Sequence, residues 1–275
     1  MIRSIFILVF MFLAGSVQSQ DPDYLELVKS ESLLQDLFVQ LYSDSLSDNE
    51  PLLLTILDIM PDALSTVGAM EFPWNGLNRI GVVTSDDHAV RVFTWHVMVD
   101  KDTYKYFGFI QVALKKGKVK VYALQDNGKI QRKLTRLDQS SDDWYGKLYY
   151  QIVTNSFKRK TYYTLLGMDF NNTRSTLKTI EVISIQRNRP LFEKELFFDG
   201  RDNIDRLVFE YSSQVAISVR FYPASGLITL DHLVPFHPIY KNNYEFYGPD
   251  GSYDGLEFEG GRWILHQDID ARNLN

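Results

Sequence analysis

The chain has 275 residues, a net charge of −6 and no cysteine. It is long enough to bury one large core or two small ones without disulfides or metal ions. The negative charge argues against binding to nucleic-acid phosphates. The lack of cysteine excludes disulfide bonds and a cysteine-linked lipid anchor.

The first 19 residues have the pattern of a secretory signal peptide. Arg3 precedes an apolar run at 5–13, and Val17 and Ser19 suit the −3 and −1 positions of a signal-peptidase site. The run is shorter than the roughly 18 apolar residues that a membrane-spanning helix needs. Secreted eukaryotic domains usually contain disulfides, so a cysteine-free exported chain fits the periplasm or the exterior of a bacterium. We therefore expect residues 1–19 to be removed, leaving a mature chain without stable membrane insertion.

Leucines at intervals of seven predict an amphipathic helix over about 24–43, namely Leu27, Leu34 and Leu41. A second helix is predicted from a cap at 47–49 to Met60, where Pro61 ends it. A third, short helix is predicted at 62–67. We expect the apolar stripes of these helices to dock on the domain that follows.

Beyond Trp74 the apolar period changes from helical to alternating, which predicts strands. The predicted strands cover 90–97, 104–114, 148–154, 161–166, 191–198, 206–211, 215–221 and 227–233. Residues 174–185 fit either a helix or a strand. Turns are predicted at 100–102 and at Asn127–Gly128, where a hairpin would place Asp126 opposite Lys129.

A two-residue turn at Gly260–Gly261 sets the register of the last hairpin. It pairs Glu259 with Arg262, Phe258 with Trp263, and Leu256 with Leu265. The four apolar side chains then share one face, which we expect to be buried. The charged pair is expected to form an exposed ion pair worth at most about 1 kcal/mol.

These elements predict a mainly β (α+β) fold. Amphipathic helices at 20–75 would pack on an antiparallel β-meander domain at 76–275. The meander fits a barrel or a sandwich. A propeller-like arrangement is less favoured, because no repeat of about 40 to 50 residues is present.

Asp231, His232 and His237 are candidates for a polar site, since paired histidines beside a carboxylate are common metal or acid–base groups. Pro235 lies between the histidines, so their relative direction is not fixed by spacing. The chain lacks the zinc-protease helix pattern, the nucleophile elbow and the phosphate-binding glycine loop. We assign no catalytic residue and expect no metal or cofactor.

Asp250, Ser252 and Asp254 resemble the start of a calcium loop, in which oxygen ligands recur at alternate positions. The resemblance ends at Gly261, which stands where an EF-hand needs a glutamate. Residues 249–251, with the sequence Pro-Asp-Gly, are a turn signal. This segment therefore favours a tight turn.

Aromatic residues are dense in the C-terminal third and alternate with polar ones. Rings offer flat apolar contact and amides offer directional hydrogen bonds, so a carbohydrate or peptide could bind here. The other interpretation is that the rings pack a sheet edge and its covering loop. The candidate ligand-binding residues are Tyr240, Tyr244, Tyr247, Asp250, Tyr253 and Asp254.

Several phrases between about residues 140 and 273 together resemble a family of exported bacterial proteins that has no assigned function. They are Trp144-Tyr-Gly-Lys-Leu-Tyr-Tyr150, Lys160-Thr-Tyr-Tyr-Thr-Leu-Leu-Gly167 with Asp169, Phe209-Glu-Tyr211, Asp231-His-Leu-Val-Pro235, Tyr247-Gly-Pro-Asp250 with Tyr253-Asp254-Gly255, and Asp268-Ile-Asp-Ala-Arg-Asn273. The resemblance implies an exported, β-rich protein and carries over no site residue.

These observations favour a non-enzymatic envelope protein that binds a ligand or a partner through its aromatic C-terminal region. One alternative is a hydrolase acting on envelope or extracellular polymers, which would need Asp231 and His232 to face one pocket with a second carboxylate. Another is a structural or assembly protein, which a large exposed apolar patch would indicate.

Overall fold

The computed structural model describes residues 22–43, 50–100, 103–127 and 140–270. Some predictions fall outside these residues. They are the signal peptide at 1–19, the helix cap at 47–49, the turn residues 101–102, the Gly128 and Lys129 half of a hairpin, and the end of the last family phrase at 271–273.

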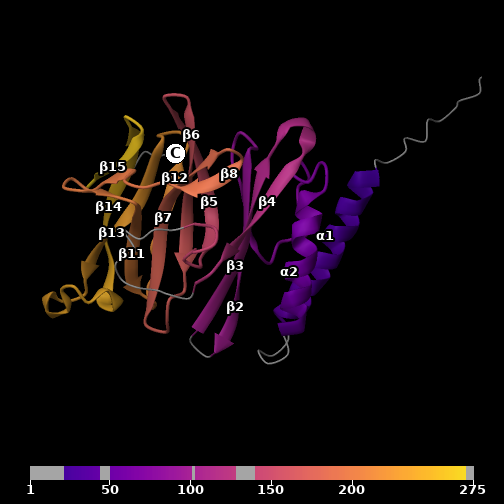
Figure 1. Ribbon diagram of the computed structural model, residues 1–275. Coiled ribbons are helices and arrows are strands. Elements are labelled where there is room, and N and C mark those ends of the chain that lie inside the picture. Colours follow the sequence, from indigo (N-terminus) through magenta and orange to yellow (C-terminus); the bar gives the residue numbers. More distant parts are fainter. Residues whose placement is uncertain (1–21, 44–49, 101–102, 128–139, 271–275) are drawn as a thin grey trace, which may run out of the picture.

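Three β-sheets are stacked one on the next, and two helices cover the outer face of the first sheet (Figure 1). Strands account for 50% of the chain and helices for 20%, so the fold is mainly β, as predicted. None of the described helices combines the length and the hydropathy needed to cross a membrane.

The two helices are α1 (Pro22–Leu41) and α2 (Glu50–Ser65). The prediction that Pro61 ends the second helix is wrong, because α2 continues through Pro61 and takes in most of the predicted third helix. Met60, Ala63 and Leu64 are buried on both sides of the proline, together with Ile56. Their burial outweighs the backbone hydrogen bond that proline cannot donate.

The first sheet has the order β1-β2-β3-β4. Its strands are β1 (Gly81–Thr84), β2 (Val90–Asp100), β3 (Thr103–Ala113) and β4 (Val119–Gln125), and a short 3₁₀ turn, η1 (Lys115–Gly117), joins the last two. Trp95 and Phe109 of this sheet share a core with Phe38 of α1 and Met60 of α2. The predicted docking of the helical stripes on the β-rich part is therefore confirmed.

The middle sheet has the order β11-β7-β6-β5, and β8 also pairs with β7. Its strands are β5 (Leu148–Phe157), β6 (Lys160–Asp169), β7 (Ser175–Gln186), β8 (Arg189–Phe192) and β11 (Arg206–Ser212). The ambiguous segment 174–185 is thus a strand. The predicted strand at 191–198 divides between β8 and a strand of the next sheet.

The last sheet has the order β10-β9-β15-β14-β13-β12. Its strands are β9 (Phe197–Phe198), β10 (Asn203–Ile204), β12 (Val219–Tyr222), β13 (Leu227–Pro235), β14 (Tyr247–Glu259) and β15 (Arg262–His266). The 3₁₀ turns η3 (Pro238–Tyr240) and η4 (Tyr244–Phe246) join β13 to β14. The pairing of β15 with β9 is parallel, an exception to the predicted antiparallel meander.

The predicted register of the last hairpin is confirmed at all three pairs. Leu256 and Trp263 are fully buried, whereas Phe258 and Leu265 are half-buried. The predicted Glu259–Arg262 ion pair is wrong. Arg262 instead donates to Asn203 Oδ1 at 3.2 Å and lies over the Phe198 ring, because β9 and β10 continue the sheet beside β15.

The middle sheet is buried on both faces. Leu165 and Ile183 pack with Val92 and Ile110 of the first sheet, while residues of the opposite face pack against the last sheet. That second contact joins Leu166, Ile180 and Val182 to Ile228, Leu256 and Trp263. The sheets thus pack face to face as in a sandwich, and the antiparallel sheets include a half-barrel.

Candidate functional site

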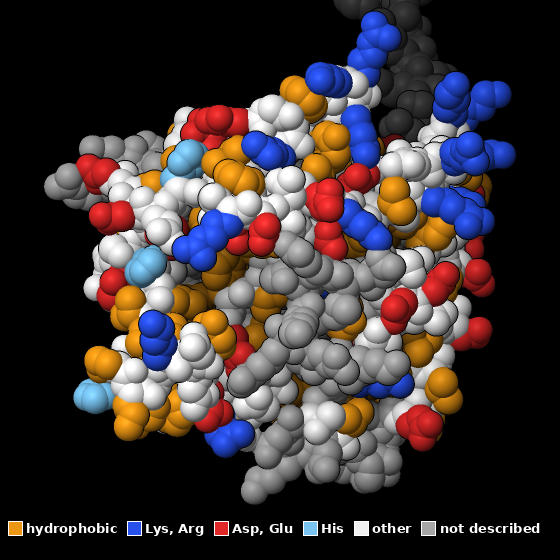
Figure 2. All heavy atoms as spheres, turned by 60° about the vertical axis from the view of Figure 1, so that its left-hand side comes forward, with side chains coloured by type: hydrophobic (Ala, Val, Ile, Leu, Met, Phe, Trp, Pro, Cys, Tyr) orange, Lys and Arg blue, Asp and Glu red, His pale blue; other side chains and the backbone are white. Residues whose placement is uncertain are grey.

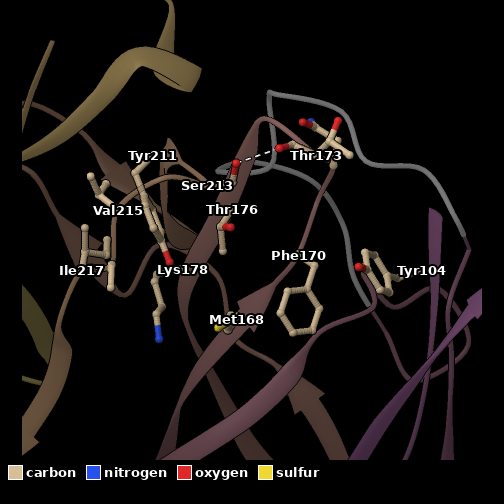
Figure 3. A pocket seen from close by; sticks show the side chains of 12 residues that line it. Tyr104, Met168, Phe170, Thr173, Thr176, Lys178, Tyr211, Ser213, Val215 and Ile217 are labelled. Atoms are coloured by element: carbon tan, nitrogen blue, oxygen red, sulfur yellow. Dashed lines mark hydrogen bonds between the residues drawn. The ribbon is translucent and has the colours of Figure 1, made fainter. Parts of the chain in front are cut away.

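A cleft opens where β6 ends and β7 begins, on the face of the middle sheet that is turned towards the last sheet (Figure 3). Its volume is about 500 Å³, and Lys178 and Ile217 also line an adjoining depression of about 420 Å³. The two together are called the Lys178 cleft below. Figure 3 shows Lys178 between Val215 and Ile217 on one side and Phe170 and Tyr104 on the other.

Strand alternation places Lys178 in this cleft. Along β7, Thr176 and Lys178 share a face with the buried Ile180, while Glu181 lies on the opposite face. In the sheet, Lys178 pairs with Met168 of β6 and with Phe209 of β11. The lysine thus extends from a rigid, doubly buried sheet rather than from a loop.

A β-bulge brings a second ring to the lysine. The β5–β6 register shifts between Tyr149 and Gln151, so Tyr149 is buried towards the first sheet while Tyr150 reaches the cleft. The ammonium group of Lys178 lies 4.1 Å from the centre of the Tyr150 ring. This distance is typical of a cation–π contact.

Side chains of β5 also fix the far wall of the cleft. Tyr150 Oη donates to Val219 O at 3.0 Å, and Gln151 Oε1 accepts from Phe221 N at 3.0 Å. Gln151 Nε2 donates back to Phe221 O at 3.3 Å. These bonds join β5 and β12, the facing edge strands of two sheets, and hold the wall in place.

The electrostatics of the cleft are set by burial. Burial lowers the pKa of Lys178 below its usual value and raises the pKa of Tyr211 and of Tyr150. Among the described residues, no carboxylate forms an ion pair with Lys178. The cleft therefore contains a cation that is partly removed from water and has only an aromatic face beside it.

The wall opposite Ile217 is aromatic. The rings of Tyr104 and Phe170 lie 5.1 Å apart, and His96 packs 5.0 Å from Phe170. Ser213 Oγ donates to Thr173 O at 2.7 Å at the rim. The described lining contains no histidine and no carboxylate, and its titratable side chains are lysine, arginine and tyrosine. Its chemistry suits the binding of a ligand.

A second group of charges is buried deeper, between the first and middle sheets. Lys147 Nζ lies 3.1 Å from both carboxylate oxygens of Glu181. Arg206 Nη1 lies 3.8 Å from Glu181 Oε2, and Tyr149 Oη donates to Glu181. Burial alone would raise the pKa of Glu181, but Lys147 and Arg206 hold it below its usual value. The three charged side chains are at most 3% exposed, so this group is closed to ligands.

The predicted polar site is dispersed. His232 Nδ1 lies 2.9 Å from Asp254 Oδ2, while Asp231 Oδ2 accepts from Ser218 N at 2.7 Å. His237 Nδ1 accepts from Ile239 N at 3.3 Å and caps η3. Asp231 and His232 point in different directions because neighbours on a strand face opposite sides. The hydrolase interpretation required them to share a pocket, and this condition is not met.

The predicted tight turn at 249–251 lies inside a strand. The β13–β14 register passes from Asp231–Tyr253 to Leu233–Pro249, which leaves residues 250–252 as a bulge. Asp250 Oδ1 accepts from Ser252 N and Oγ at 2.9 and 2.8 Å, and these bonds lower the pKa of Asp250. Gly251 has φ +91°, a conformation that favours glycine.

Asp254, which the calcium-loop pattern grouped with Asp250, serves a different contact. Its Oδ1 accepts from Asp268 N at 3.0 Å, and its hydrogen bond to His232 raises the pKa of that histidine. Asp254 thus joins the chain after β15 to the β13–β14 pair.

Two of the predicted aromatic residues, Tyr240 and Tyr244, lie in the connection between β13 and β14, and Tyr247 begins β14. Tyr240 stacks on Phe246 at 4.3 Å, and Tyr244 packs 4.9 Å from Tyr247. Tyr247 Oη accepts from Asn242 N at 3.0 Å. Tyr244 is 41% exposed, and these three rings lie outside the lining of the Lys178 cleft. Tyr253, 38% exposed, lies further along β14.

The surface of the last sheet carries hydrophobic side chains mainly at one end. Figure 2 shows them gathered at the lower left, with charges of both signs spread over the rest of the face. In the connection between β13 and β14, Phe236 and Ile239 are 52% and 77% exposed. Glu245 of the same connection pairs with Arg174 at 3.1 Å, close to the rim of the Lys178 cleft.

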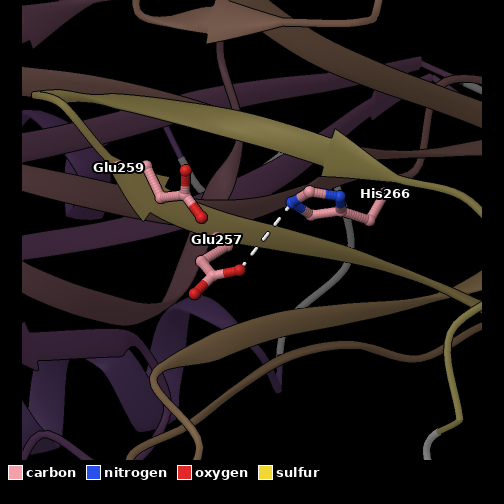
Figure 4. Close-up of side chains that lie close together, drawn as sticks. All are labelled: Glu257, Glu259 and His266. Carbon is pink, nitrogen blue, oxygen red and sulfur yellow. Dashed lines mark ion pairs between the residues drawn. The ribbon is translucent and has the colours of Figure 1, made fainter.

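Glu257, Glu259 and His266 lie close together on β14 and β15 (Figure 4), with potential ligand atoms within 4.8 Å of one another. His266 Nε2 lies 3.8 Å from Glu257 Oε2. All three side chains are exposed, so water competes with every contact. We assign no ion to this surface ion pair.

The sequence analysis did not identify Lys178. Its signal was present, because Lys178 and Glu181 are the only charged residues in 175–185, a segment whose apolar residues occur at both parities. A strand apolar on both faces is buried on both faces, so a charge within it needs a partner or a role. The ambiguity between helix and strand concealed this pattern.

Comparison of the chain with family models, with curated proteins and with solved structures finds no match.

Proposed function

We propose that this chain is an exported bacterial protein of the envelope or exterior, that residues 1–19 are its signal peptide, and that it binds a small ligand in the Lys178 cleft without catalysing a reaction. The pattern of residues 1–19 and the family resemblance support export, and the lack of cysteine supports a bacterial compartment. The single observation that carries the binding role is the half-buried Lys178, which faces a cleft and has an aromatic ring as its only close partner among the described residues.

The size and lining of the cleft support the same function. Small-molecule sites typically measure about 300 to 1,000 Å³ and combine apolar walls with a few polar groups. The two depressions of about 500 and 420 Å³ are in this range, and the walls include Met168, Phe170, Tyr211 and Ile217. Met168 and Tyr211 belong to strands of the middle sheet, and such preorganised walls lower the entropic cost of binding.

The aromatic C-terminal connection is the weaker candidate surface. Its rings are paired with one another, Tyr240 with Phe246 and Tyr244 with Tyr247, so a ligand would have to compete with existing contacts. A ligand that binds at Lys178 does not have to separate these ring pairs.

Titration with N-phenyl-1-naphthylamine, a neutral dye that fluoresces in apolar sites, tests the binding role. The exposed Ala216 lines the cleft, so Ala216→Trp should fill it and abolish most dye binding. Ala224 is exposed on the β12–β13 turn away from the cleft, and Ala224→Trp is the matched control. Equal binding by both variants and the unsubstituted protein would show that the dye does not use the cleft and would contradict the proposal.

A further inference from the structure

The described lining of the Lys178 cleft is positively charged in a negatively charged protein. Lys178 and Arg220 are its cations, and none of the described lining residues is Asp or Glu. The whole chain has a net charge of −6. A cleft that concentrates positive charge attracts a negatively charged ligand.

The contacts of Lys178 only partly offset the free energy that its charge loses on leaving water. Its contact with the Tyr150 ring recovers only part of what a cation loses when it leaves water. Lys147 provides the comparison, because this buried lysine has both oxygens of Glu181 at 3.1 Å. Lys147, which is closed to solvent, therefore has a carboxylate beside it. Lys178, which faces the cleft, forms no ion pair with a carboxylate among the described residues.

Arg220 lines one end of the cleft, and the rings of Phe170 and Tyr104 line the other end. Arg220 and Tyr150 line the smaller depression, Tyr104 and Phe170 line the larger one, and Lys178 lines both. Lys178 therefore marks the boundary between a cationic end and an apolar, aromatic end. A ligand that fits both ends has a negative group joined to an apolar body.

We propose that the ligand of the Lys178 cleft is a small amphipathic organic anion. Its carboxylate, sulfonate or phosphate group contacts Lys178 Nζ on the side of Arg220, and its apolar body lies against Phe170 and Tyr104. This inference rests on the proposed function and adds the charge and the orientation of the ligand.

Two dyes that differ by one charged group test this inference. 8-Anilinonaphthalene-1-sulfonate has the same ring skeleton as the neutral N-phenyl-1-naphthylamine and adds a sulfonate. The unsubstituted protein should bind the anionic dye about 10-fold or more tightly than the neutral one, since a charge-assisted hydrogen bond is worth that factor. Lys178→Met should abolish this preference and change the affinity for the neutral dye less than about 2-fold.

Three further variants separate charge from packing. Lys178→Arg keeps the cation and should keep the preference, which gives a readout even if Lys178→Met folds poorly. Arg220→Met should reduce the preference by a smaller factor, because Arg220 is exposed. Lys120 also lies over a tyrosine ring, at 5.1 Å from Tyr122, but outside the cleft, so Lys120→Met should leave both affinities unchanged.

The outcomes distinguish the two proposals. Equal affinity for the two dyes, or an equal loss of both in Lys178→Met, overturns the anion inference while the cleft remains a binding site. Binding of both dyes that Ala216→Trp leaves unchanged overturns the proposed function itself.

Discussion

Lys178 and Tyr150 come from strands that are not neighbours, since β6 lies between β7 and β5, yet the lysine ammonium lies 4.1 Å from the centre of the tyrosine ring. The two side chains reach over the β6 row at Met168, and the β5 bulge brings Tyr150 to the cleft. The contact places the ammonium group of Lys178 beside the aromatic ring that lines the smaller depression.

The lowered pKa of Lys178 predicts how anion binding changes with pH. The ammonium form binds an anion, and it persists only below the pKa, which burial moves below 10.5. Affinity for 8-anilinonaphthalene-1-sulfonate should therefore fall as pH rises through a midpoint below 10.5, while affinity for the neutral dye stays constant. Lys178→Arg should remove this fall, because arginine keeps its charge. A pH-independent ratio of the two affinities in the unsubstituted protein would contradict the prediction.

Removing the charge of Glu181 should destabilise the fold strongly. Glu181→Gln would remove the carboxylate whose two oxygens lie 3.1 Å from the buried ammonium group of Lys147, which costs about 3 to 5 kcal/mol of unfolding free energy. Urea unfolding measures this difference. The exposed Glu257→Gln is the control and should change the unfolding free energy by less than about 0.5 kcal/mol. Similar losses in the two variants would show that the buried group does not act as described.

The His232–Asp254 pair should stabilise the protein at acidic pH. The hydrogen bond to Asp254 raises the folded-state pKa of His232 above 6.5, so the stabilisation is complete below pH 6.5 and is lost as pH rises through the folded-state pKa. His232→Gln should thus cost up to about 1 kcal/mol at pH 5.5 and less at pH 8.5, because the pair is partly exposed. His266→Gln is the exposed control. An equal cost of His232→Gln at both pH values would be evidence against the pair.

The signal peptide makes a prediction that is independent of the cleft. When the full chain is expressed in a bacterium, the product outside the cytoplasm should begin at Gln20, as read by N-terminal sequencing. Val9→Arg interrupts the apolar run and should leave the unprocessed precursor inside the cell. Export of a product that still contains residues 1–19 would refute this assignment.

Much of the fold could be predicted from local patterns. The Gly260–Gly261 turn sets the register of its two strands within a few residues, so the pairs at Phe258 and Leu256 followed from sequence alone. The segment 174–185 could not be assigned, because β7 is buried on both faces and lacks the alternation that identifies a strand.

The cleft could not be predicted for a related reason. Tyr150, Lys178 and Ile217 are distant in sequence and meet only through strand order, a β-bulge and the stacking of two sheets. Adjacency in sequence also led to a wrong expectation, that two neighbouring residues share one site. Asp231 and His232 are adjacent in sequence and form contacts in different directions.

A crystal structure of the protein with 8-anilinonaphthalene-1-sulfonate tests the central claim most directly. The account predicts a sulfonate oxygen about 2.8 Å from Lys178 Nζ and the naphthalene ring against Phe170 and Tyr104. Dye bound instead over Tyr240, Tyr244 and Tyr247, with the Lys178 cleft empty, would contradict it.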